Sequence, residues 1–158
     1  MSERARALAE RFEQANRELI QTVERLSEAQ WKTQTAGEGW GVNVVAHHVA
    51  ESHKGIAGLV QRVASGGGSA PLPTMETVHE RNAVHARQHA DCTKPETLAL
   101  LRQNGAAAAA IVRGLGDAEL DRTAPLPLGT MSVAEVIERI LIGHGHGHHG
   151  SIRQAIGA

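Results

Sequence analysis

Histidine is concentrated in one short segment near the C-terminus, GHGHGHHGSIR, which runs from Gly143 to Arg153. Imidazole nitrogens bind zinc, nickel and related divalent ions, and two histidines four residues apart on a helix can reach the same ion. His144 and His148 have that spacing. A leftover affinity tag would have a similar composition, but the residues SIRQAIGA continue a helical pattern beyond the histidines. We therefore interpret the segment as part of a helix.

A helical wheel with about 100° per residue divides this cluster into two pairs. With His144 placed at zero, His148 falls at about 40°, within the apolar stripe of the helix. The stripe is formed by Val133, Ile137, Ile140, Leu141, Ile152 and Ala155. His146 and His149 fall at about 200° and about 140°, outside the stripe, and we expect both to be solvated.

Three more histidines lie in the segment VVAHHVAESHKG, which has a helical pattern of its own. His48 falls on the apolar face of that helix, whereas His47 and His53 fall outside it and are expected to be solvated. A single inward histidine is usually a core residue that is hydrogen-bonded to a carbonyl. Three inward imidazoles need a shared reason, because burying each without a partner is costly. We therefore predict that His48, His144 and His148 bind one divalent metal ion.

Three neutral imidazoles leave coordination positions of an ion open, as in catalytic rather than structural sites. Such an ion can lower the pKa of a bound water to near neutrality, or hold a low-molecular-weight thiol as its thiolate. Nitrogen ligands suit zinc and nickel better than magnesium or calcium. The candidate catalytic residues are Glu51, one turn after His48, and Asn82, on a shorter helix; solvation at the surface is the alternative for Glu51.

The remaining conspicuous side chains have structural interpretations. Trp40 can wall the site or belong to the core. His79, His85 and His89 are expected at the polar edge of a short helix. Cys92 lies beside a helix cap without a visible partner, and we expect it to be unreactive.

Glycines alternate with the histidines of the last helix, at Gly143, Gly145, Gly147 and Gly150. Each costs about 1 kcal/mol relative to alanine in a helix interior, so they need an explanation. We interpret them as positions that allow close approach of another helix or subunit, or space beside the metal.

Hydrophobic periodicity and capping signals predict the helices that must position these residues. We predict four long helices, at 2–26, 42–64, 95–114 and from 132 to the C-terminus, one short helix at 74–89, and a loop at 65–73. No segment has a convincing strand pattern. The fold class predicted is all-α: an up-down four-helix bundle with one additional short helix, in a single domain spanning residues 1–158.

Composition narrows the classes of function. The chain has 16 basic and 17 acidic residues, and a net charge of -1 gives no electrostatic reason to expect a nucleic-acid partner. It has no long apolar run for a membrane, and its start is too charged for a secretory signal, so we expect a cytoplasmic protein. One cysteine excludes an internal disulfide and a cysteine-based zinc cluster.

The segments GWGVNVVAHHVAES and ERILIGHGHGHHGSIRQAI together resemble two signatures of the DinB-like superfamily. In that family a metal-binding histidine follows a tryptophan by eight residues, as His48 follows Trp40. The last-helix signature is HxxxHxxQI, with His144 and His148 as ligands and Ser151 where glutamine is common. The segment GLGDAELDR is similar to the connection before the last helix.

The resemblance implies a four-helix bundle that binds zinc, nickel or another divalent ion through the three histidines, often as a homodimer. Members with known activity include enzymes that use mycothiol or bacillithiol for S-transfer or isomerisation, and glutathione is a further candidate thiol. Three hypotheses stay open: a metal-dependent thiol transferase or hydrolase acting on an unidentified small molecule, a non-catalytic metal-binding bundle, and an interaction module with a metal-free histidine core.

Overall fold

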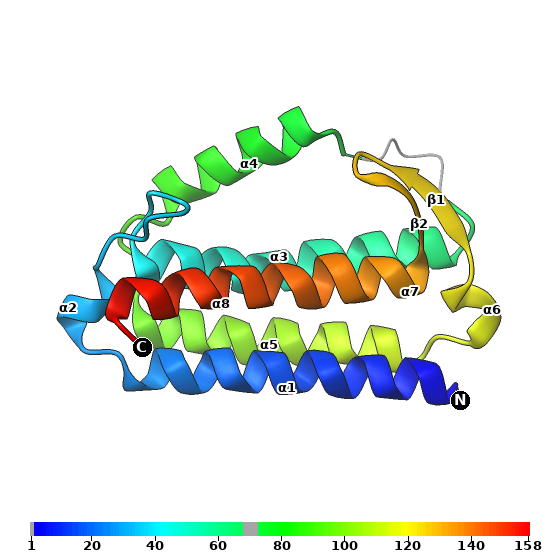
Figure 1. The fold of residues 1–158 in the computed structure, drawn as a ribbon, viewed down its shortest axis with the longest axis horizontal. Coiled ribbons are helices and arrows are strands. Elements are labelled where there is room, and N and C mark those ends of the chain that lie inside the picture. Colours follow the sequence, from blue (N-terminus) through cyan, green and yellow to red (C-terminus); the bar gives the residue numbers. More distant parts are fainter. Residues whose placement is uncertain (1, 68–72) are drawn as a thin grey trace.

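The computed structural model describes residues 2–67 and 73–158 of the chain. Four long helical rods lie side by side (Figure 1). They are α1 (Glu3–Arg25), α3 (Val42–Ala64), α5 (Lys94–Arg113) and a C-terminal rod made of α7 (Val133–Glu135), the π-helical segment η1 (Val136–Ile142) and α8 (Gly143–Ile156). The predicted all-α four-helix bundle is confirmed, and the observed bounds lie close to the predicted ones.

The additional short helix is α4 (Met75–Gln88), which lies outside the bundle. It returns the chain between α3 and α5, so those two helices run in the same direction rather than alternating (Figure 1). None of its residues, all of which the structure describes, is buried. The helix is therefore held to the bundle without an apolar core of its own. The predicted loop before it lies partly outside the described residues, at 68–72.

The bundle has two apolar clusters with a polar layer between them. The first contains residues from the start of α1 and the ends of α3 and α5, and the second contains residues from the end of α1 and the starts of α3 and α5. Between them, Asn16 donates from Nδ2 to the Leu101 carbonyl at 2.9 Å and lies 2.9 Å from His53 Nε2 through Oδ1. Gly105 faces this layer, since a Cβ atom there would lie 2.2 Å from Asn16 Nδ2.

A β-hairpin interrupts the helical fold, contrary to the prediction that the chain has no strand. Strands β1 (Thr123–Leu126) and β2 (Gly129–Ser132) pair antiparallel, and Gly129 takes a φ of 115° at the turn. The strands are too short for an alternating pattern to appear in the sequence. The proline in β1 is tolerated because the strand has one partner only among the described residues.

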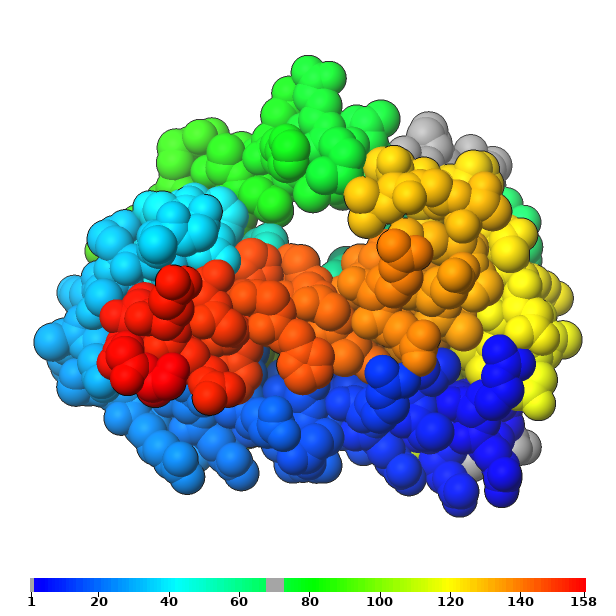
Figure 2. Space-filling view, in the orientation of Figure 1, coloured from blue at the N-terminus to red at the C-terminus, as the bar shows by residue number. Residues whose placement is uncertain are grey.

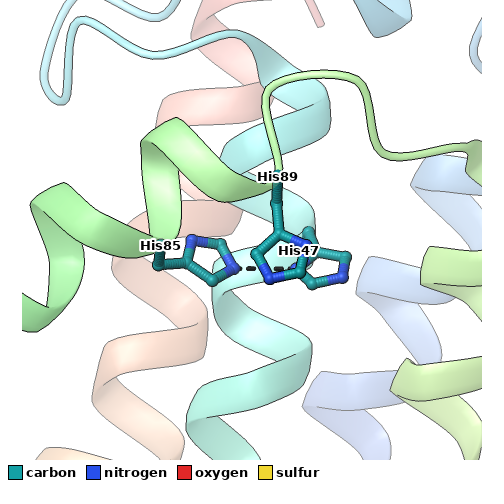
Figure 3. Close-up of side chains that lie close together, drawn as sticks. All are labelled: His47, His85 and His89. Atoms are coloured by element: carbon teal, nitrogen blue, oxygen red, sulfur yellow. Dashed lines mark hydrogen bonds between the residues drawn. The ribbon is translucent and has the colours of Figure 1, made fainter.

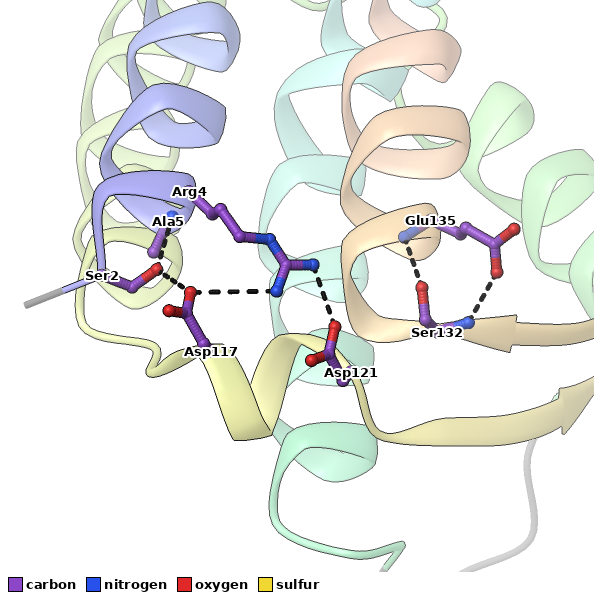
Figure 4. Close-up of polar contacts among 7 residues, drawn as sticks. All are labelled: Ser2, Arg4, Ala5, Asp117, Asp121, Ser132 and Glu135. Atoms are coloured by element: carbon purple, nitrogen blue, oxygen red, sulfur yellow. Dashed lines mark hydrogen bonds and ion pairs between the residues drawn. The ribbon is translucent and has the colours of Figure 1, made fainter.

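The ends of these elements are fixed by local polar contacts (Figure 4). The Ser2 hydroxyl donates to Asp117 of the short helix α6 (Asp117–Leu120), and Arg4 pairs with Asp121 at 2.9 Å. Ser132 and Glu135 form a capping box that starts the C-terminal rod. A second short helix, α2 (Glu28–Trp31), lies in the connection between α1 and α3.

The π-helical segment η1 lies directly before the histidine-rich part of the last helix. At its end the Gly143 N–H reaches the Glu138 carbonyl, five residues back rather than four. Within the described part of the chain, no helix combines the length and apolar character that a membrane crossing needs.

Candidate metal centre

Three imidazoles from α3 and α8 converge on one point. His144 Nε2 lies 3.0 Å from His48 Nε2 and 3.2 Å from His148 Nε2. His48 is buried and the other two side chains are partly buried. The structure therefore brings together all three residues that the helical wheels selected.

The donor set and its spacing fit a divalent ion. Two nitrogens bound tetrahedrally to one zinc ion at about 2.0–2.1 Å would lie about 3.3 Å apart. The single lone pair or proton on His144 Nε2 can satisfy only one of its two neighbours, whereas an ion could use all three lone pairs. Burial, followed by the neighbouring imidazoles, lowers the pKa of His48 and of His144 to about 3, so both are neutral at physiological pH, as metal ligands must be.

Glu38 orients one of the three imidazoles. Its Oε1 lies 2.8 Å from His148 Nδ1, which leaves Nε2 of that ring facing the other histidines. Burial alone would raise the pKa of Glu38. Hydrogen bonds involving His148, Thr35 and Ser151 lower it by more than burial raises it, so the carboxylate stays ionised. A carboxylate behind a ligating histidine fixes its tautomer and strengthens it as a ligand.

The sequence reasoning missed Glu38 because its loop contains glycines on both sides and has no periodicity. The loop is nevertheless ordered, since the Thr35 N–H donates to the Trp40 carbonyl at 2.8 Å and Gln34 bridges to Gly41. Trp40 itself packs edge-on against His48, with ring centroids 5.5 Å apart. The only available signal was an acidic residue two positions before this tryptophan.

A largely apolar cavity of about 310 Å³ opens onto two of the histidines. Its wall consists of residues from α3, α4, the hairpin and η1, including Ile56, Leu59, Val78, Leu126 and Ile140 beside His48 and His144. The opening between α4 and the hairpin is visible in the space-filling view (Figure 2). The site is therefore accessible to a small molecule through this opening.

The two candidate catalytic residues lie in different places. Asn82 is partly buried and lines the apolar cavity with His48 and His144. Glu51 is exposed and lines a neighbouring, more open cleft with Lys54 and other charged residues. The structure thus brings Asn82 to the site and places Glu51 beside it.

Three histidines that the wheels placed in solvent are buried. The exposed fractions are 1% for His47, 3% for His53 and 8% for His149, and only His146 is exposed as predicted. A wheel assumes one buried face, but α3 contacts α5, α8 and α4, and α8 contacts both α1 and α3. His53 therefore meets Asn16 of α1, and His149 lies 2.8 Å from the Thr22 hydroxyl of α1.

The prediction for the histidines of α4 was partly wrong. His79 is exposed, as expected, but His85 and His89 are partly buried and lie against His47. Cys92 is buried and donates from Sγ to the Asn43 carbonyl at 3.3 Å. Burial raises the pKa of its thiol, in agreement with the unreactive role predicted for it.

The glycines of α8 do not accommodate a neighbouring helix of the same chain. A Cβ atom at Gly145, Gly147 or Gly150 would meet no described atom within 4 Å, and at Gly143 it would meet only the Glu138 carbonyl at 3.4 Å. The interpretation as sites of close helix approach within the chain is therefore wrong. Approach of a second subunit stays a prediction.

Comparison with known proteins places this geometry in a family. The family sequence model for the mycothiol maleylpyruvate isomerase N-terminal domain matches residues 12–142 of the chain. None of the curated proteins compared with the chain matches it significantly.

Solved structures share the fold. YfiT from Bacillus subtilis, described as a probable metal-dependent hydrolase with an unusual four-helix bundle topology, superposes with a TM-score of 0.78 at 21% identity, over 99% of this chain and 90% of that chain. The mycothiol-dependent maleylpyruvate isomerase superposes with a TM-score of 0.74 at 13% identity, and one of its mutants with the same score at 12% identity. In both cases 96% of this chain is covered but only 63% of the isomerase chain. The chain belongs to the family of mycothiol maleylpyruvate isomerase N-terminal domains, within the DinB-like superfamily.

Proposed function

We propose that the protein is a divalent-metal-dependent enzyme that acts on a small, largely apolar electrophile. It either attaches a low-molecular-weight thiol to the electrophile or isomerises the electrophile with the thiol as cofactor. The observation that carries the proposal is the convergence of three imidazole Nε2 atoms, 3.0 and 3.2 Å apart, beside an apolar cavity. His48, His144 and His148 would hold the ion. Nitrogen donors favour zinc or nickel.

Each neighbouring residue has a role that follows from its position. A bound ion would supply the Lewis acidity that keeps a thiol or a water deprotonated at neutral pH. Glu38 accepts a hydrogen bond from His148 Nδ1 and so orients that ring, and Trp40 packs edge-on against the His48 ring. The amide of Asn82 is one of the few polar groups in a mainly apolar cavity wall, with Ser52 and Arg81, and it would help to orient a substrate.

The thiol is inferred from the family. Its model describes a domain of a mycothiol-dependent isomerase, so mycothiol is the first candidate and bacillithiol and glutathione are the next. The cavity volume of about 310 Å³ lies at the lower end of the range for small-molecule sites, which fits a small electrophilic substrate.

The test uses full-length protein purified without a tag and loaded with zinc or nickel. It is incubated with each of the three thiols and a panel of small electrophiles, and adduct formation or isomerisation is followed by chromatography. We expect turnover with one thiol, and loss of that turnover in His144→Gln. His146→Gln, which changes an exposed histidine of the same helix, is the matched control. Equal turnover in wild type and His144→Gln would overturn the proposal.

Metal-dependent hydrolysis is the second candidate, favoured by the structural likeness to YfiT. Small esters and amides offered without thiol distinguish it, since a hydrolase would turn them over and a thiol transferase would not. A non-catalytic metal-binding bundle is the third reading. It would bind metal through the same three histidines and give no turnover in either assay.

A further inference from the structure

A second group of histidines lies next to the first, around an adjacent face of α3. His47 projects from α3, and His85 and His89 project from α4 and its C-cap, four residues apart (Figure 3). Ligand nitrogens of the three residues all lie within 4.8 Å of one another. His47 Nδ1 is 2.7 Å from His85 Nε2, and the His89 ring stacks on His47 with centroids 4.1 Å apart.

The cluster is incompletely satisfied by the protein. In a pair of neutral imidazoles, the contact between His47 and His85 uses one N–H and one lone pair. The other nitrogens, His47 Nε2 and His85 Nδ1, are buried without a hydrogen-bond partner among the described residues. Since buried polar atoms are nearly always paired, the protein alone does not satisfy this pair of rings. A shared ion would take up the lone pairs of the facing nitrogens, His47 Nδ1 and His85 Nε2, so that neither has to carry a proton.

The surroundings favour a cation. The carboxylates of Glu51 and Glu96 place negative charge near the His47 ring. His85 and His89 are partly exposed, which gives an ion a route into the cluster.

We propose that His47, His85 and His89 form a second divalent-metal site, distinct from the centre at His48, His144 and His148, and that an ion bound there fastens α4 to the bundle. Imidazole donors select zinc, nickel or a similar borderline ion. The site is separate in its ligands but adjacent in space, since the His48 and His85 rings lie 5.6 Å apart.

The consequence for the fold follows from how weakly α4 is otherwise attached. The helix contributes no buried residue, and its C-terminal end is tied to the bundle by polar contacts such as Asn43 Nδ2 to the Ala90 carbonyl at 2.9 Å. Yet α4 supplies Val78 and Asn82 to the cavity wall. An ion shared by α3 and α4 would therefore hold one wall of the cavity in place.

Metal stoichiometry tests the proposal directly. Apo protein of full length and without a tag is dialysed against zinc at neutral pH, and bound zinc is measured by elemental analysis. We expect two ions per chain in wild type and in His79→Gln, which alters an exposed histidine of the same helix. His85→Gln should bind one ion and His144→Gln should bind one. Circular dichroism verifies that each variant is folded.

The outcomes separate the two sites. A wild-type protein with one ion that His144→Gln loses and His85→Gln retains would overturn the second site and leave the first intact. A wild-type protein with one ion that His85→Gln loses and His144→Gln retains would support the second site and argue against the first.

Hydrogen exchange of the α4 backbone gives a readout independent of stoichiometry and of activity. Zinc should slow exchange across Met75–Gln88 by about tenfold or more in wild type and in His144→Gln, because the ion suppresses local opening of this helix. It should have no such effect in His85→Gln. Equal protection of α4 in His85→Gln would contradict the proposal.

Discussion

Glu38 and His148 form a pair whose geometry sets the direction of one ligand. The Glu38 carboxylate occupies Nδ1 at 2.8 Å, so the lone pair of Nε2 faces His144. Ser151, which stands where the family signature often has glutamine, lowers the pKa of the same carboxylate. A departure from the family pattern at this position therefore supports the site through Glu38 rather than through a ligand.

Removing the charge of Glu38 should weaken metal binding. Glu38→Gln can still accept from His148 but no longer stabilises the ring electrostatically, and we expect zinc affinity to fall by about 10–100-fold. Competition with a chromophoric chelator measures the dissociation constant. Glu10→Gln is the matched control, because Glu10 is exposed on α1, which carries none of the histidines of either group. An equal loss in both variants would show that general charge, not orientation of His148, is responsible.

Protonation of His53 should destabilise the fold in acid. Burial lowers its pKa from 6.5 to about 4, so the unfolded chain takes up a proton at a higher pH than the folded one. The neutral His53 ring makes its full contribution to the free energy of unfolding above pH 6.5. That contribution, on the order of 3 kcal/mol, is lost as the pH falls toward 4. Urea unfolding of apo protein between pH 4 and 8 measures it.

Comparison with His53→Gln isolates this contribution, because glutamine can still donate to Asn16 Oδ1 but does not titrate. Its stability should fall less steeply in acid than that of wild type. His146→Gln should follow the wild-type curve, since that ring is exposed. Parallel curves for wild type and His53→Gln would contradict the assignment.

At the scale of the elements, glycine has opposite effects in α5 and α8. Gly105 of α5 lies in the polar layer against Asn16, where a Cβ atom would approach Nδ2 to 2.2 Å. Gly147 of α8 faces open space. The first glycine is required by packing, and nothing in the described structure requires the second.

Alanine at the two positions should therefore change stability with opposite sign. Gly147→Ala should raise the free energy of unfolding by up to about 1 kcal/mol, as expected for a free helix position. Gly105→Ala should lower it by about 1–3 kcal/mol, because Asn16 must give up its place beside the Leu101 carbonyl. Urea midpoints measure both changes. Destabilisation by Gly147→Ala would instead indicate that this face of α8 contacts another subunit.

At the scale of the whole molecule, the cavity exists because four separate parts of the chain meet around it. The bundle supplies His48 and His144, while α4 and the hairpin complete the wall above them. The hairpin contributes Leu126 and Leu128, which are too far along the chain from His48 for any local pattern to connect them. An outer helix and a short hairpin thus turn a histidine-bearing bundle into a site with an entrance.

Metal removal should destabilise the whole molecule. An ion bound only by the folded state adds about 2.7 kcal/mol at a hundred times its dissociation constant, or about 5–10 °C in Tm for a chain of this size. Thermal unfolding after dialysis against EDTA, with and without added zinc, measures the difference. Magnesium is the matched control and should have no effect, because imidazole nitrogens are poor ligands for it. Equal Tm values with and without zinc would contradict metal binding by the folded state.

The predicted homodimer is a separate expectation that sedimentation can test.

The sequence by itself determined the features that repeat locally. Apolar residues spaced three and four apart, with caps such as Ser132 and Glu135, predicted the long helices closely. The same periodicity selected His48, His144 and His148, since residues four apart on a helix share a face whatever surrounds them. The family signatures around Trp40 and Ser151 agreed with that choice.

Only the tertiary structure decided what covers each face. Glu38 reaches His148 across 110 positions of sequence from an aperiodic loop. His47 meets His85 because α4 folds back along α3, and His53 is buried because α3 is covered on more than one side. A helical period encodes which residues share a face, but not how many neighbours that helix has. The number of neighbours depends on packing between distant segments of the chain. Because α3 and α8 have more neighbours than one buried face allows, three histidines that were expected in solvent are buried.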